Sequence, residues 1–326
     1  MVEVDELMEL SIIIVNWNSK DYLQKCIASI LGSKIEATYE IVVIDGGSFD
    51  GSGDMLRQCY PQVKFIQSEK NVGFAKANNI AFKASSGSYV LFLNPDTEVV
   101  VPAINILFEQ MQKLLKVGVI GCKLLNADGS IQTSCIQSFP TILNQLLNSE
   151  FLRALFPKSR LWGMELLFSS TNEPAEADML SGACITMRRE IFEQVGCFSE
   201  EYFMYAEDVD LCYKVKQAGY KNYYVPNATI FHFGGGSSQQ KPSDFSVVMM
   251  RDSIWRFLRK TRGELYGSLY RCSMLISAIG RIVCLFVFLP LYLVLGRLAS
   301  WKASARKWWA ISVWSMSLKE RAGEKS

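Results

Sequence analysis

The chain of 326 residues has a single histidine, His232, which excludes every site that needs two imidazole ligands, such as the H-E-x-x-H zinc hydrolases. Its nine cysteines lie at least 12 residues apart, which excludes C-x-x-C zinc and redox motifs, and their odd number disfavours a secreted disulfide scaffold. A G-x-G-x-x-G fingerprint after the first predicted strand and a Walker A Gly-Lys-Ser/Thr are both missing. The sequence therefore predicts a protein of a reducing compartment with neither a dinucleotide fingerprint nor a P-loop.

Charge is distributed unevenly along the chain, although the net charge is only +2. Residues 1–240 carry 19 basic and 27 acidic side chains, a net charge of −8, whereas residues 241–326 carry 15 basic and 5 acidic ones, a net charge of +10. Residues 1–10 contain four acids and no apolar run, so no signal peptide is predicted. We therefore expect a domain over residues 1–240 and a basic tail over residues 241–326.

The basic tail also contains the longest apolar run. Residues 282–295 are 14 uncharged positions, fewer than the roughly 20 that cross a bilayer core, and Pro290 would kink a helix there. With Arg281 snorkelling, residues 273–296 reach spanning length. Residues 301–314 interleave four tryptophans with three cations, as is typical of a membrane interface. The tail is therefore expected to be helical and membrane-associated, either spanning or lying flat; the alternative is a soluble helical bundle.

Short apolar strands alternate with amphipathic helices over the first 125 residues. Strands are expected at residues 11–16, 40–45, 63–67, 89–93 and 117–125, with helices after residue 19 and at 53–59, 73–84 and 102–115. Nearly all-apolar strands separated by helices indicate an α/β fold with a doubly wound, mostly parallel sheet and helices on both faces. Ligands of such sheets bind at the carboxyl ends of the strands, where Asp45, Asn94 and Asp96 fall.

Two of these strand ends carry turns suited to a ligand. Asp45 is followed by two glycines and Ser48, which let the backbone approach a ligand closely; the alternative is an ordinary turn with an Asx cap. In Asn94-Pro95-Asp96, the proline fixes the turn and Asp96 presents oxygens, as a divalent ion that bridges phosphates requires. The alternative there is a type I turn that only closes the strand.

A second group of candidate residues lies after residue 200. Glu207, Asp208 and Asp210 follow a run of aromatic residues, whose desolvating effect would raise a carboxyl pKa toward that of a general base. In a helix, Asp208 and Asp210 would face different directions; the alternative is acids placed against a helix dipole. His232 precedes a glycine-rich loop over residues 234–238, so it is either a ligand at a phosphate site or a structural hydrogen-bonder.

The order of these motifs resembles glycosyltransferase family 2, and within it the rhamnosyltransferase-like branch of bacterial cell-surface polysaccharide synthesis. The matching stretches are SIIIVNWN, VVIDGGSFDGS, NVGFAKANN, LFLNPDTEV, SGACITMRREIFEQVGCFSEEYFMYAEDVDLCYKVKQAGY and VPNATIFHFGGGSS. The resemblance implies a GT-A fold and an inverting enzyme. It would move a sugar, with rhamnose as a candidate, from a nucleotide diphospho-sugar to a hydroxyl of a lipid-linked or cell-surface glycan. It implies a place at the cytoplasmic face of the plasma membrane and no nucleic-acid partner.

The resemblance also implies roles for the matching residues. Asp208, with its neighbour Glu207, matches the catalytic base, which takes the proton of the acceptor hydroxyl. Asp96 and His232 match ligands of Mn²⁺ or Mg²⁺ on the donor diphosphate. Asp45 matches the acid that contacts the nucleotide base. The full set of implied nucleotide-binding residues is Val15, Asn16, Asn18, Asp45, Ser48, Asn71, Gly73, Asn79 and Asn94. The segment that borders the sugar and acceptor is implied to consist of Ser181, Gly182 and Ala183.

The sequence departs from the family pattern at several positions. Asn94 stands where the metal motif has its first acid, so the metal is expected to bind weakly or to arrive with the donor. Gly46 and Met179 replace a frequent asparagine and a frequent tryptophan, which leaves base and acceptor preference open. Residues 138–171, with an amphipathic stretch over 143–156, match nothing in the family and are expected to form an acceptor flap or a packed insertion.

Two other functions stay open from the sequence. A nucleotidyltransferase that forms sugar nucleotides shares the doubly wound sheet, but it would need a glycine-rich loop with Arg and Lys where this chain has N-W-N-S after the first strand. A non-catalytic scaffold would keep the fold and use the tail to recruit partners. The joint presence of Asp96, Glu207, Asp208 and His232 disfavours such a scaffold.

Overall fold

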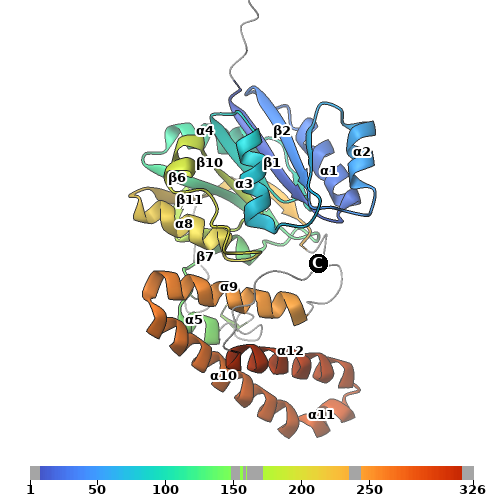
Figure 1. Cartoon of the computed structure of the whole chain (residues 1–326), viewed down its shortest axis with the longest axis vertical. Coiled ribbons are helices and arrows are strands. Elements are labelled where there is room, and N and C mark those ends of the chain that lie inside the picture. The colour runs from blue at the N-terminus through green and yellow to red at the C-terminus, as the bar shows by residue number, and fades with distance from the viewer. Residues whose placement is uncertain (1–7, 148–154, 157–158, 160–171, 235–243, 318–326) are drawn as a thin grey trace, which may run out of the picture.

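A computed structural model describes residues 8–147, 155–156, 159, 172–234 and 244–317 (Figure 1). Among them, nine strands form one sheet in the order β3-β2-β1-β4-β10-β6-β11-β5, with β8 paired to β11. The strands are β1 Leu10–Asn16, β2 Tyr39–Asp45, β3 Lys64–Gln67, β4 Tyr89–Leu93, β5 Thr97–Val99, β6 Val117–Leu125, β8 Ala175–Ala177, β10 Cys184–Arg188 and β11 Lys221–His232. Two short strands, β7 Ile136–Gln137 and β9 Met179–Leu180, pair separately.

Helices flank this sheet, and further helices follow it toward the C-terminus. Those of the sheet domain are α1 Lys20–Leu31, α2 Ser52–Cys59, α3 Phe74–Ala84, α4 Ala103–Lys113, α5 Ile142–Leu147, α7 Arg189–Gln194 and α8 Glu207–Gln217. The C-terminal helices are α9 Asp244–Arg262, α10 Glu264–Val287, α11 Leu289–Val294 and α12 Leu298–Met316. The predicted α/β sheet is confirmed, and each expected strand and helix of the first 125 residues is found within two residues of its predicted ends.

The sheet is mostly parallel because its central strands are apolar on both faces. Ile12, Ile13 and Ile14 of β1 are fully buried, as expected for a strand covered by helices on either side. β1 pairs in parallel with β2 and β4, β2 with β3, and β6 with β11. β5 and β8 pair antiparallel with β11 at one side of the sheet. Within the sheet, β10 lies antiparallel between β4 and β6. This strand was not among those expected, and it brings the chain from residues 181–183 into the middle of the sheet.

Strand register gathers the candidate residues at one edge. Asn16 and Asp45 are opposite each other at the carboxyl ends of β1 and β2. β10 begins at Cys184 opposite Leu93, the last residue of β4, so residues 181–183 lie beside the turn that starts at Asn94. At the far side, His232 ends β11 opposite Thr97, next to Asp96 in the chain. The edge predicted to bind ligands is therefore where these residues meet.

The C-terminal helices pack on the sheet domain through α9. Figure 1 shows α9 lying between the sheet domain and a layer formed by α10, α11 and α12. Phe257 and Leu258 of α9 are buried in the same hydrophobic core as the sheet. On its other side, Asp252 accepts a hydrogen bond from Nε1 of the buried Trp314 of α12 at 2.9 Å. The domain boundary at residue 240 stays a prediction. α9 contacts both the sheet domain and the other C-terminal helices.

Residues 273–296 do not form one continuous helix, in agreement with the kink expected at Pro290. α10 ends at Val287, and α11 begins at Leu289 with Pro290 in its first turn. Proline has no N–H to donate to the preceding turn, and its ring clashes with the carbonyl four residues before it, so a helix stops ahead of it. Among the described residues, α10, which starts at Glu264, is long and apolar enough to cross a membrane; whether the tail spans or lies flat stays open.

Two stretches singled out in the sequence are only partly described. Of residues 138–171, the structure describes 138–147, 155–156 and 159, and the first of these ranges contains α5. Of the glycine-rich loop at 234–238, only Gly234 is among the described residues. The predictions for the flap and for the phosphate loop therefore lie mostly outside the described part of the chain.

Candidate active site

Asp45 organises the turn after β2. It is 1% exposed, and its carboxylate accepts four hydrogen bonds. Asn16 Nδ2 (2.7 Å) donates to Oδ2, while the backbone N–H groups of Gly47 (3.1 Å) and Ser48 (2.8 Å) and Nε2 of Gln67 (2.9 Å) donate to Oδ1. Four donors around one carboxylate hold it in one orientation and fix the turn. Gln67 was not predicted, although its place at the end of the strand beside β2 is the signal that could have found it. Base contact by Asp45 stays a prediction.

The end of β1 is joined to the same turn. Ser48 Oγ accepts hydrogen bonds from the backbone N–H of Asn18 at 2.8 Å and from Asn16 Nδ2 at 3.3 Å. Asn18 adopts a left-handed conformation (φ 49°), which asparagine tolerates, and its Oδ1 accepts the N–H of Phe49 at 3.0 Å. The buried Oδ1 of Asn16 has no hydrogen-bond partner among the described residues. Because buried acceptors are rarely left unpaired, this oxygen is a candidate ligand contact beside half-buried Val15.

The start of α3 is held against the loop that precedes the acidic cluster. Asn71 Oδ1 accepts the N–H of Gly73 at 2.9 Å, and the N–H of Phe74 donates to the carbonyl of Phe203 at 2.8 Å. Gly73 has φ 87°, and a Cβ there would lie 2.5 Å from the carbonyl oxygen of Phe203. Only glycine fits this position, so Asn71 and Gly73 set the position of the Phe203 loop.

Asn79 is not grouped with the other predicted nucleotide-binding residues. It is buried in the middle of α3, and its Oδ1 accepts the N–H of Phe198 at 3.1 Å. Its Nδ2 donates to the carbonyl of Phe198 at 2.9 Å and to Glu200 Oε1 at 3.1 Å. The side chain thus ties α3 to residues 198–200, and a contact with nucleotide stays an untested prediction.

The two predicted metal ligands lie together, although 136 residues separate them in the sequence. Asp96 Oδ1 lies 3.3 Å from Nε2 of His232, and Nδ2 of Asn94 lies 3.5 Å from the same Nε2. Nδ1 of His232 is 2.7 Å from Gln132 Oε1. An amide oxygen accepts hydrogen bonds, so Nδ1–H is the donor, and in the neutral form of the ring the lone pair of Nε2 faces Asp96. Two lone pairs at this distance repel each other unless a proton or a cation lies between them. Gln132 carries no signal in the sequence that could have identified it.

The pair fits a divalent cation that is bound together with a phosphorylated ligand. Adjacent ligands of an octahedral ion at about 2.1 Å lie about 3 Å apart, close to the distance between Asp96 and His232. Within the described part of the chain, no group of three or more His, Cys, Asp or Glu is placed to hold a metal. The buried Oδ1 of Asn94 lacks a hydrogen-bond partner among the same residues and offers one more oxygen. The rest of a coordination shell would have to come from the ligand.

Asp208 is held at the start of α8 by two backbone groups. Its Oδ2 accepts the N–H of Gly182 at 2.8 Å, and its Oδ1 accepts the N–H of Val209 at 2.8 Å. Burial raises the pKa of Asp208 above its ordinary value, and the two N–H groups oppose that shift. A Cβ at Gly182 would lie 3.3 Å from the Cβ and Oδ2 of Asp208, so glycine lets this backbone come close.

Glu207 is more deeply buried than its neighbour. Desolvation, with the nearby charge of Asp208, raises its pKa to about 8. Its buried Oε2 has no hydrogen-bond partner among the described residues. At neutral pH, Glu207 is therefore mostly protonated, and Asp208 is the carboxylate of the two that carries the negative charge.

Residues 181–183 join the turn that starts at Asn94 to the acidic pair. The carbonyl of Ala183 accepts the N–H of Asn94 at 3.0 Å, while the N–H of Gly182 donates to Asp208. Ser181 is anchored in turn, because its N–H donates to the carbonyl of Cys135 at 3.1 Å and its Oγ accepts the N–H of Ala183 at 3.3 Å. The structure thus brings the predicted cation ligands and the predicted base to the two sides of one short segment.

Asp210 points away from Asp208, as expected, and fixes the other side of the helix. It is fully buried, accepts the Oγ–H of Ser199 at 2.6 Å and pairs with Lys260 of α9 at 2.9 Å. Just before α8, Tyr205 and Ala206 have φ values of 68° and 64°, which are unfavourable for residues with a side chain. A loop in this conformation persists only when its surroundings hold it, and Asp210 supplies part of that hold. Lys260 was not predicted because it lies beyond the expected domain boundary.

Comparison with known proteins identifies the chain's relatives. The family model described as "Glycosyl transferase family 2" matches residues 11–196. The N-acetylglucosaminyl-diphospho-decaprenol L-rhamnosyltransferase of Mycobacterium tuberculosis is 29% identical over 250 residues, which are 72% of this chain and 79% of the relative. Rhamnosyltransferase WbbL of Escherichia coli is 26% identical over 235 residues, 68% of this chain and 82% of the relative.

A solved structure shares the fold. The mannosyltransferase PcManGT from Pyrobaculum calidifontis, in complex with GDP-Man and Mn²⁺, superposes with a TM-score of 0.56 at 15% identity. The superposition covers 95% of this chain and 88% of that one. At this identity the likeness concerns the fold alone, and it extends beyond the sheet domain.

Gly73→Ala should destabilise the fold more than a substitution that adds backbone strain alone. Both Gly73 (φ 87°) and Gly129 (φ 79°) have positive φ, but a Cβ at Gly129 has no atom within 4 Å. We expect a loss of about 1–3 kcal/mol from strain in either variant, and a larger loss for Gly73→Ala because of its clash with Phe203. Urea unfolding of Gly73→Ala and Gly129→Ala measures the difference; equal losses would mean that the Phe203 loop moves aside.

Glu207→Gln should change how stability depends on pH. With a folded-state pKa of about 8 against an ordinary value of 4.5, folded Glu207 binds its proton more tightly than the unfolded chain does. Its contribution to the free energy of unfolding is complete below about pH 4.5 and is lost as pH rises toward 8. The variant should therefore match the parent near pH 5 and be more stable at pH 8, as measured by denaturant unfolding. The exposed Glu36→Gln is the control. A parent and variant with parallel pH profiles would contradict the burial of a neutral Glu207.

Proposed function

Because the chain belongs to glycosyltransferase family 2, we propose that this glycosyltransferase moves rhamnose from a nucleoside diphosphate donor to a sugar hydroxyl of a diphosphate-linked isoprenoid lipid. Two relatives are rhamnosyltransferases, which supports rhamnose, and one of them acts on a lipid-diphosphate acceptor. The observation that carries the proposal is the backbone bridge at residues 181–183, which contacts Asn94 on one side and Asp208 on the other. With a cation site on one side of this segment and a base on the other, a sugar bound between the two can be transferred in a single displacement.

Asp208 acts as the general base in this proposal. Its oxygens face the N–H groups of Gly182 and Val209, which hold the carboxylate in one orientation. Burial raises its pKa and so strengthens it as a proton acceptor. It takes the proton of the acceptor hydroxyl as that oxygen bonds to the anomeric carbon and the bond from that carbon to the diphosphate oxygen breaks. Attack opposite the leaving group inverts the anomeric configuration. Glu207, which is neutral at pH 7, leaves the charge on Asp208.

Asp96 and His232 would hold Mn²⁺ or Mg²⁺ against the donor, with Asn94 nearby. Gln132 Oε1 accepts a hydrogen bond from Nδ1–H of His232, which leaves Nε2 available as a ligand. The metal would offset the charge that develops on the departing nucleoside diphosphate. Because the protein offers few ligands of its own, the cation arrives with the donor. Asn16, Asn18, Asp45, Ser48 and Asn71 form the network expected to receive the nucleotide.

The enzyme is further proposed to work at the cytoplasmic face of the plasma membrane, where a lipid-linked acceptor is found. Apolar side chains of α10 and α11 point to solvent, among them Ile276, Val283 and Val294, which are 72%, 55% and 83% exposed. So many exposed large apolar side chains on neighbouring helices are rare on a soluble domain and favour a contact with membrane or protein. The net charge of the tail favours anionic lipid. Neither a nucleotidyltransferase nor a non-catalytic scaffold gains support from the family match.

Asp208→Asn should lower sugar transfer by about 10²–10⁴-fold, the usual contribution of a general base. Donor binding should persist, because the substitution leaves Asp96, His232 and the nucleotide network intact. Transfer rates with a panel of nucleotide diphospho-sugars, and thermal stabilisation by the same donors with Mn²⁺, measure the two effects. The exposed Asp54→Asn on α2 is the control. Normal turnover of Asp208→Asn would remove the assignment of the base.

The triple variant Ile276→Glu/Val283→Glu/Val294→Glu should no longer sediment with anionic liposomes, because each glutamate would be carried into an apolar layer. These side chains are exposed, so the fold should survive; donor-dependent thermal stabilisation checks it. Leu115→Glu, at a position of the sheet domain that is 85% exposed, is the matched control. Sedimentation of the triple variant at the parent's level would place the membrane contact elsewhere.

A further inference from the structure

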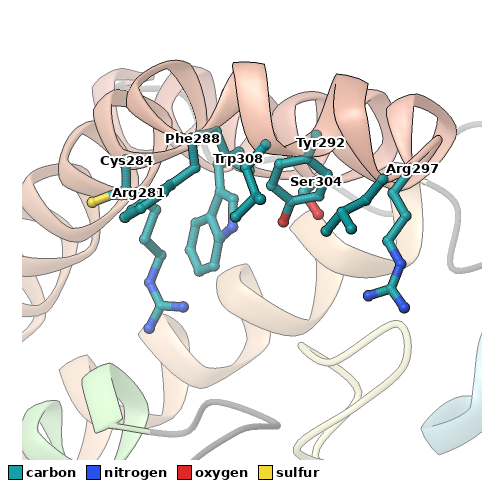
Figure 2. Close-up of a pocket in the computed structure, with 10 residues that line it drawn as sticks. Arg281, Cys284, Phe288, Tyr292, Arg297, Ser304 and Trp308 are labelled. Carbon is teal, nitrogen blue, oxygen red and sulfur yellow. The ribbon is translucent and has the colours of Figure 1, made fainter.

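The C-terminal helices enclose a cavity that the catalytic scheme does not use. It has a volume of about 460 Å³ and lies among α10, α11 and α12, within the range of about 300–1,000 Å³ that small-molecule sites occupy. Figure 2 shows Arg281 and Arg297 near the two ends of the cavity, with Trp308, Tyr292 and Ser304 between them. Both guanidinium groups extend from the helices toward the same side.

The charges around this cavity are of one sign. Residues 271–317 contain six Lys and Arg and no acidic residue. Arg281 donates to the carbonyl of Leu146 at 3.3 Å and lies 4.4 Å from the ring centroid of Trp308. Neither Arg281 nor Arg297 pairs with an acid in the described part of the chain, and the pKa of Arg281 is lowered by burial and by another cation, Arg251 of α9. Unpaired arginines around one hollow favour an anionic ligand, phosphate above all.

The walls between the two arginines are apolar. Phe288, Leu291 and Leu295 line the cavity and are each more than half exposed, so they have no apolar cover of their own. A ligand that suits both features has an anionic head and a hydrocarbon chain. A bilayer contact would instead use apolar side chains outside this cavity. The side chains that suit a bilayer, Ile276 and Val294, do not line it.

The cavity is also linked to the catalytic loop. Lys260 of α9 bonds with Glu201 Oε1 at 2.8 Å and Asp210 Oδ1 at 2.9 Å, and Ser253 of α9 donates to the carbonyl of Met204 at 2.9 Å. Because α9 also packs on α10 and α12, a ligand held by these helices has a fixed position relative to the loop that precedes Asp208.

We propose that this cavity binds the diphosphate and the first isoprene units of the lipid-linked acceptor, with Arg281 and Arg297 pairing with the phosphates and Phe288, Leu291 and Leu295 contacting the chain. The inference rests on the proposed function and names the place where its acceptor lipid is held.

A direct binding measurement tests whether the cavity holds such a ligand, and it does not require turnover. Farnesyl diphosphate is titrated by calorimetry into the full chain in EDTA, so that the donor site cannot take diphosphate through a metal. We expect Arg281→Gln/Arg297→Gln to raise its Kd at least tenfold, and inorganic diphosphate and farnesol each to bind the parent at least tenfold more weakly. Lys302→Gln/Arg306→Gln, which removes two cations of α12 that do not line the cavity, is the matched control. Equal Kd values for the parent and the Arg281/Arg297 variant would overturn the proposal.

Kinetic measurements then distinguish a role of the two arginines in this cavity from a role at the donor site or in contact with the bilayer. With a polyisoprenyl diphosphate-linked acceptor, the Arg281/Arg297 variant should show an acceptor KM raised at least tenfold, with unchanged donor KM and unchanged metal-dependent donor hydrolysis. Its sedimentation with phosphatidylglycerol vesicles should match that of the parent. An unchanged acceptor KM with lost sedimentation would assign the arginines to the bilayer and overturn the inference. A parent without donor turnover would instead remove the proposed function, while the farnesyl diphosphate titration would still decide the cavity.

Discussion

The site depends on two backbone hydrogen bonds from one short segment. Residues 181–183 lead directly into β10, which lies antiparallel between β4 and β6. In that position the carbonyl of Ala183 meets the N–H of Asn94, and the N–H of Gly182 meets the carboxylate of Asp208. Backbone groups beside a sheet move little, so the pairing of β10 holds the proposed cation ligands and the proposed base at a set separation. The parallel strand ends in the same way hold the residues proposed to bind the nucleotide.

Burial gives the two neighbouring acids different protonation states. Glu207 and Asp208 are adjacent in sequence, but Glu207 is buried without a donor for Oε2, whereas Asp208 receives two N–H groups. Burial therefore keeps the first neutral and leaves the second charged. The unfavourable backbone at Tyr205 and Ala206, just before the pair, is held by contacts from both sides. Gly73 admits the Phe203 carbonyl, and Lys260 binds Asp210.

Periodicity and apolar runs predicted most strands and helices of the first 125 residues, because burial on both faces demands such patterns; the three-residue β5 was not predicted. The pairing of Asp96 with His232 came from a family resemblance, since no local pattern links positions so far apart. Gln132 escaped prediction because its partner lies 100 residues away, and β10 because its run C-I-T-M-R fits a strand and a helix equally well. Pro290 pointed to the helix break, but where the neighbouring helix starts depends on tertiary packing.

The buried contact between Lys260 and Asp210 has a practical consequence for handling the enzyme. Detergents that solubilise the apolar faces of α10–α12 compete with the packing that seats α9. Because α9 carries Lys260 and Ser253, loosening it withdraws support from the loop before the base. Activity lost on extraction would then reflect a relaxed catalytic loop rather than a missing substrate, and reconstitution into lipid would restore it without any change in the chain.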